Sequence, residues 1–184
     1  MPVFSPRRML YRSLPILTAM MIIEMVGGSA LATRYDSIMP IFLVLLPPFL
    51  AVGGNVGSVF GSRVSSALHL GLVRPSIRDN PNLTPNVVAL TFSGLVSFAC
   101  LGVFVYLVSS ILDIGGVSPM AFMSITLLSG ICLTFFTIGL SLWVCFASFR
   151  RGLDPDDVVV PVVASTTDLV GIILLLTFIL ILGS

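Results

Sequence analysis

A single carboxylate, Asp168, lies inside a stretch of apolar residues that is long enough to cross a lipid bilayer. The stretch covers residues 158–182, and a helix of about 20 such residues spans the hydrocarbon. At about 1.5 Å of rise per residue, Asp168 lies about 15 Å from the acidic cluster that ends at Asp157, near the membrane midplane. A charge at that depth costs at least about 2.5–3.5 kcal/mol on insertion scales. A bound cation is the simplest group that could offset this cost.

Small and polar residues around Asp168 predict that this helix face points into the protein. Ser165 and Thr167 add hydroxyl groups, and Ala164 lies one turn before Asp168 on the same face. Such a face suits an ion site better than contact with lipid. The alternative is that Asp168 pairs with Arg63 or with another interior polar group.

A second unusual stretch, residues 46–58, combines two adjacent prolines with the sequence Gly53-Gly54-Asn55. We expect the prolines and glycines to interrupt the helix, which is tolerated at membrane depth only where the backbone is buried in protein or lines a wet cavity. Freed carbonyls and the Asn55 side chain are hard oxygen donors that suit Mg²⁺. Close packing of helices through small residues is the alternative explanation for the glycines.

Further acids lie near the ends and inside of the apolar stretches. The segment 154–157, Asp-Pro-Asp-Asp, offers an N-cap carboxylate, a first-turn proline and negative charge at the positive end of a helix. Its acids, Asp157 among them, either cap the helix or form a vestibule or regulatory site that attracts cations. Glu24, in the first apolar stretch, either contributes to an ion path or pairs with a polar neighbour.

The composition indicates an all-α integral membrane protein. Of the residues, 57% are hydrophobic and only 9% charged, and the mean hydropathy is +1.13, whereas soluble domains carry about 25% charged residues. Hydropathy predicts five transmembrane helices in a single domain, residues 1–184, without a soluble regulatory domain. The predicted spans are approximately 13–33, 37–63, 84–109, 120–149 and 155–182.

The arginines set the predicted orientation. With five spans, every arginine except Arg34 falls on one side of the membrane. The positive-inside rule then places the N-terminus in the cytoplasm and the C-terminus outside. The expected location is the cell (plasma) membrane, as a multi-pass protein surrounded by lipid.

Several function classes are excluded by what the sequence contains. The net charge of +1 indicates no nucleic-acid partner. No Ser/His/Asp or metal-hydrolase arrangement is present, so the chain is not expected to be an enzyme. His69, the one histidine, falls in the predicted loop 67–86 and is interpreted as an interfacial polar residue rather than a ligand.

Two motifs together resemble the MgtE family of magnesium channels and transporters. The first, in residues 47–71, contains Gly-Gly-Asn-Val-Gly followed by Gly-Ser-Arg-Val-Ser-Ser-Ala-Leu-His-Leu-Gly, and its Ser-Arg-Val-Ser-Ser portion is most similar to the animal solute-carrier branch. The second, residues 153–168, resembles the Asn-Pro-Asp-Asn segment of that branch, which leads to an Asp. The resemblance covers essentially the whole chain as one five-helix unit, of which the animal transporters carry two.

This resemblance implies a dimer with a central pore that is lined by the second and fifth helices of each half. Bacterial members add cytoplasmic magnesium-sensing domains, so their gating is not carried over to this sequence. The family's ion-binding aspartate is matched by Asp168, and its Gly-Gly-Asn region beside the pore by residues 53–55. The candidate ion-binding or pore-lining residues are Asp168, Asn55, Gly53, Gly54 and Ala164, with Thr167, Glu24 and Asp157 as secondary candidates.

The resulting hypothesis is divalent cation transport, with Mg²⁺ as the transported ion and Mn²⁺ or Co²⁺ also compatible with oxygen ligands. A two-fold axis in a homodimer would bring two Asp168 carboxylates to one partly hydrated ion. Sodium-coupled magnesium exchange is an alternative mechanism. A non-transporting membrane scaffold subunit is an alternative of another class.

Overall fold

The computed structural model describes residues 6–32, 40–76, 80–114 and 117–182, and the regular elements in these ranges are all α-helices. They are α1 (Pro6–Ala32), α2 (Pro40–His69), α3 (Leu83–Ile111), α4 (Pro119–Arg150) and α5 (Pro155–Leu182). The all-α prediction is therefore confirmed. The side chains of α1 are described from Leu14 to Ser29.

Four of the helices, α2 to α5, are long and apolar enough to cross a bilayer. The described apolar part of α1, Leu14–Ser29, is shorter than a typical span. The chain is thus a membrane protein with several apolar helices, while the fifth crossing and the orientation of the termini stay predictions.

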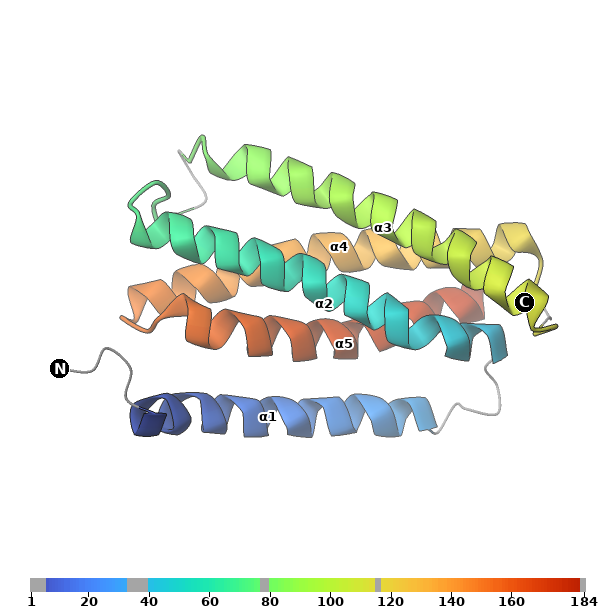
Figure 1. Cartoon of the computed structure of the whole chain (residues 1–184), viewed down its shortest axis with the longest axis horizontal. Coiled ribbons are helices and arrows are strands. Elements are labelled where there is room, and N and C mark those ends of the chain that lie inside the picture. The colour runs from blue at the N-terminus through green and yellow to red at the C-terminus, as the bar shows by residue number, and fades with distance from the viewer. Residues whose placement is uncertain (1–5, 33–39, 77–79, 115–116, 183–184) are drawn as a thin grey trace.

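The helices lie roughly parallel to one common axis, and consecutive helices run in opposite directions (Figure 1). Helix α5 lies between α1 and α2 and also packs on α4, while α3 covers α2 and α4. The main contacts of α1, among the described residues, are with α5, where Gly27 lies against Leu169 and Ile172. The end of α2, the end of α4 and the starts of α1 and α5 share one end of the bundle (Figure 1).

Two apolar clusters hold α2 to α5 together. Near one end, the rings of Phe42 of α2 and Phe122 of α4 pack in a tilted arrangement with 5.4 Å between their centroids. The ring centroids of Phe49 and Phe98 of α3 are 4.9 Å apart. Near the other end, fully buried Phe60 centres a second cluster. Because aromatic pairs add to the energy of close packing, these clusters fix the helices around the polar residues between them.

The predicted interruption of the second helix is wrong. Helix α2 is continuous from Pro40 to His69, with Pro47 and Pro48 inside it, and it extends six residues past the predicted end at 63. Membrane helices tolerate proline because neighbouring helices can satisfy the freed backbone groups. Direct packing of α2 on α4 and α5 stabilises the helical path through the glycines that follow.

Candidate functional site

Three glycines on one face of α2 bring its backbone directly against α4 and α5. A methyl group on Gly57 would lie 2.2 Å from Thr137 Cγ2, and one on Gly61 would lie 2.2 Å from Val159 Cγ1. A methyl group on Gly53 would lie 2.7 Å from a leucine of α4. Real Cβ atoms essentially never come this close, so a side chain at any of these positions would force a neighbouring group to move. Small residues that permit close helix contact are typical of membrane interfaces.

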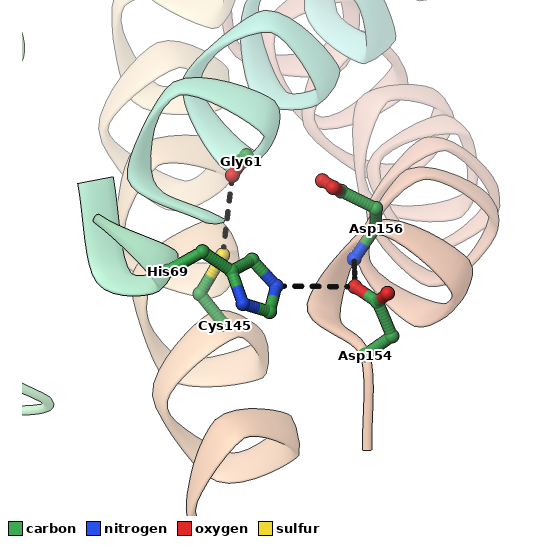
Figure 2. A network of polar contacts seen from close by, with 5 residues as sticks. All are labelled: Gly61, His69, Cys145, Asp154 and Asp156. Atoms are coloured by element: carbon green, nitrogen blue, oxygen red, sulfur yellow. Dashed lines mark hydrogen bonds and ion pairs between the residues drawn. The ribbon is translucent and has the colours of Figure 1, made fainter. Parts of the chain in front are cut away.

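Hydroxyl and thiol groups of α4 form hydrogen bonds to backbone carbonyl oxygens of α2 along the same face. The Ser141 hydroxyl lies between two acceptors, the Gly57 carbonyl oxygen of α2 at 3.0 Å and the Thr137 carbonyl oxygen of its own helix at 2.8 Å. Cys145 Sγ donates to the Gly61 carbonyl oxygen at 3.3 Å (Figure 2). These carbonyls point into the bundle and are not free ion ligands, in contrast to the expectation that went with a broken helix. Close packing, the alternative explanation for the glycines, accounts for Gly53, Gly57 and Gly61.

Gly53 and Thr167, two of the predicted site residues, lie on this packed side. Thr167 is fully buried, and its hydroxyl is 3.2 Å from the Thr137 hydroxyl of α4. A methyl group on Gly53 would lie 3.0 Å from Thr167 Cγ2. The two residues therefore hold α2, α4 and α5 together, and their role in ion binding stays a prediction.

Gly54, Ala164 and Asp168 meet where α2 crosses α5. A Cβ atom on Gly54 would lie 3.8 Å from Ala164 Cα and 3.9 Å from Asp168 Oδ1, which is ordinary van der Waals contact. The Asp168 side chain is half-buried and forms no hydrogen bond or ion pair within the described residues. Arg63 is exposed and does not pair with Asp168 in the same part of the chain, so that alternative is not supported.

Asn55 lies beside this contact on the exposed side of α2. It belongs to a stripe at helical spacing whose other exposed polar members are Ser62 and Ser66. Polar side chains on a membrane helix usually face protein or water instead of lipid. The stripe next to Asp168 is therefore not expected to face lipid.

A groove of about 520 Å³ between α1 and α5 leads toward the same place. Carboxylates of Glu24, Asp156 and Asp157 line it, together with Ala164 and Ser165. Because Ala164 also contacts Gly54, the groove approaches Asp168 from the start of α5. Glu24 lines the groove and accepts a hydrogen bond from Ser165 Oγ at 2.6 Å, so it pairs with a polar neighbour, while a contribution to an ion path stays a prediction.

The start of α5 carries the predicted N-cap. The Asp156 backbone N–H donates to Asp154 Oδ1 at 3.1 Å, and the neighbouring acids Asp156 and Asp157 extend into the groove. The capping interpretation is confirmed for Asp154, while a cation-attracting vestibule formed by Asp156 and Asp157 stays a prediction.

His69 has a partner that the sequence did not indicate. It is the last residue of α2, not a loop residue, and its Nε2 atom lies 3.4 Å from Asp154 Oδ1 (Figure 2). The two residues are 85 positions apart, so no spacing rule could connect them. The signal available was that both fall on the same predicted side of the membrane.

Comparisons with known proteins identify the family to which the sequence is related. A profile of the MgtE family, described as a divalent cation transporter, matches residues 46–178. The chain is 27% identical to Solute carrier family 41 member 2 of Homo sapiens over 173 residues, and 26% identical to the Xenopus laevis protein of that name over 174 residues. These matches cover 88% of this chain but only 30% and 31% of the relatives, so the chain spans less than a third of their length. No solved structure matched at comparable significance.

Proposed function

Because this chain belongs to the MgtE family of divalent cation transporters, we propose that it moves magnesium across the plasma membrane through a site formed by α2 and α5. The observation that carries the proposal is Asp168, a half-buried carboxylate that lacks a protein partner in the described part of the chain. Such a charge within a membrane span is costly unless a cation compensates it. The glycine at position 54 leaves the space beside its Oδ1 atom free of any side chain from α2.

The complete site is proposed to need two copies of the chain. The stripe with Asn55 is exposed, and Ala164 and Asp168 beside it are only partly buried. A two-fold axis beside them would bring two Asp168 carboxylates to one ion. Two such carboxylates repel each other, and a divalent cation between them cancels their charge.

The ion is proposed to stay largely hydrated at this site. Mg²⁺ prefers about six oxygens at 2.0–2.1 Å and gives up its water reluctantly. Asp168 and the Asn55 amide oxygen would hold it through that water, while Gly53 and Thr167 keep the helices in place beneath it. Oxygen ligands of this kind also accept Mn²⁺ and Co²⁺.

The acidic groove is proposed to supply the ion. Glu24, Asp156 and Asp157 give its walls a negative potential, and clefts with charge of one sign raise the local concentration of counter-ions. The contact of Ala164 with both the groove and the Asp168 site gives the ion a short path between them.

Magnesium flux into liposomes tests the proposal. Asp168→Asn keeps the size of the side chain and removes its charge, so we expect flux to fall at least tenfold. The matched control is Asp113→Asn, which makes the same chemical change at an exposed residue with φ of 56°, a conformation that asparagine also tolerates. Wild-type protein without any magnesium flux or divalent-dependent stabilisation would favour the scaffold alternative.

A further inference from the structure

The ends of α2 and α5 bring three metal-ligating side chains together at the start of α5, beside the acidic groove and apart from Asp168. His69 closes α2, and Asp154 and Asp156 open α5 (Figure 2). One ligand atom from each residue lies within 4.8 Å of the others. We propose that these three residues bind a transition-metal ion of the zinc class, with water completing its coordination.

The spacing of the first two ligands is compatible with a shared metal ion as well as with a long hydrogen bond. His69 Nε2 and Asp154 Oδ1 are 3.4 Å apart, which is long for a bond between nitrogen and a carboxylate. Tetrahedral Zn²⁺ with bonds of about 2.0–2.1 Å separates its ligands by roughly 3.3 Å. An ion beside this pair therefore needs little movement of either side chain.

Neighbouring groups orient the ligands before any ion binds. The His69 ring meets Phe149 of α4 edge-on, with 5.9 Å between ring centroids. The Asp156 backbone N–H donates to Asp154 Oδ1, which fixes the carboxylate over the first turn of α5. The side chains of His69 and Asp154 are about half exposed, at 48% and 47%, so water can reach the remaining coordination positions.

The ligand types distinguish this site from the magnesium site proposed at Asp168. Imidazole nitrogen suits Zn²⁺, Co²⁺ and Ni²⁺, whereas Mg²⁺ and Ca²⁺ take oxygen ligands. Asp156 also lines the acidic groove, so a bound ion would both tie α2 to α5 and neutralise charge at the mouth of that groove. The binding itself does not depend on whether the protein transports magnesium.

Zinc binding to the full chain in detergent tests the proposal. After treatment with a chelator, the protein is titrated with ZnCl₂ by calorimetry, and its thermal unfolding is followed with and without the metal. We expect wild-type protein to bind zinc and to gain thermal stability. His69→Ala and Asp156→Asn should each weaken binding at least tenfold. Asp154→Asn should weaken it as well while keeping the helix cap, because asparagine caps as well as aspartate does.

Asp157→Asn is the matched control, since it removes a charge one residue from the cluster without removing a proposed ligand. It should bind zinc as the wild type does. Wild-type affinity in His69→Ala would overturn the proposal and place the ion elsewhere, for instance at an exposed cysteine. Equal stabilisation by magnesium and zinc at the same concentration would contradict the assignment to the zinc class. Neither outcome involves flux, so each is distinct from a failure of the transport proposal.

Discussion

Two glycines three residues apart on α2 should respond to the same substitution in opposite ways. A methyl group on Gly57 would meet Thr137 Cγ2 at 2.2 Å and Val163 Cγ1 at 2.5 Å. A methyl group on Gly54 would have only ordinary contacts, at 3.8 Å or more, with Ala164 and Asp168. Gly57→Ala should therefore destabilise the protein, and Gly54→Ala should impair transport in a stable protein.

The expected changes in stability follow from these distances. Alanine is favoured over glycine inside a helix by about 1 kcal/mol, and this gain applies at both positions. At Gly57, overpacking costs about 1–3 kcal/mol or more, because Thr137 and Val163 are β-branched and cannot easily change rotamer. Separation of the helices would also weaken the bond from Ser141 to the Gly57 carbonyl, which is worth about 0.6 kcal/mol. The free energy of unfolding should therefore fall by about 1–2 kcal/mol for Gly57→Ala and should not fall for Gly54→Ala.

The expected loss of transport comes from the position of the new methyl group. At Gly54 it would lie 3.9 Å from Asp168 Oδ1, where the water shell of the proposed ion would be. Loss of one water-mediated contact to a charged group costs about 1.5 kcal/mol, which corresponds to roughly tenfold slower magnesium flux. Some of the flux should remain, because Asp168 keeps its charge.

The assay combines unfolding in detergent with magnesium flux in liposomes, normalised to the amount of folded protein. Gly54→Ala should unfold at or above the wild-type temperature and transport about tenfold more slowly. Gly57→Ala should unfold at a lower temperature, and its folded fraction should transport normally. The reverse assignment, with Gly57→Ala stable and Gly54→Ala fully active, would refute the packing of α2 described above.

Other consequences of the structure can be measured with the same preparations. Glu24→Gln should lower flux severalfold at low ionic strength and less at high salt, because a groove charge acts through screened attraction; unchanged salt dependence would count against the groove as the ion path. Ser141→Ala should cost about 0.6 kcal/mol of stability by removing the hydroxyl group that links α4 to the Gly57 carbonyl of α2, with flux per folded protein unchanged. An imposed sodium gradient should leave magnesium flux unchanged if the site acts as a channel, whereas flux that follows the gradient would establish the sodium-coupled alternative.

Most of the fold could be predicted from sequence because apolar length alone defines membrane helices. The start of α5 at Pro155 agrees with its capping signals, and the boundaries of α3 and α4 lie within two residues of the predicted spans. The course of α2 could not be predicted in the same way. Proline and glycine weaken a helix locally, and whether the helix persists depends on what packs against it.

The candidate site was predictable only in part for the same reason. Asp168 can be identified from the sequence alone because a charge is unusual at that depth. Gly53 and Gly54 are adjacent and identical in type, yet one packs on α4 and the other faces Asp168, a difference set by the rotation of α2. The contact between His69 and Asp154 depends on how two distant helix ends meet, which hydropathy does not specify.

The position of magnesium in the assembled protein is the most direct test of the central claim. A structure determined in magnesium, from protein in a lipid bilayer, should show two chains related by a two-fold axis and an ion density between their Asp168 carboxylates. The ion should keep most of its water and lie beside Gly54 and Asn55 of both chains. Chains that meet through another face, or an ion that lies away from Asp168, would contradict the account.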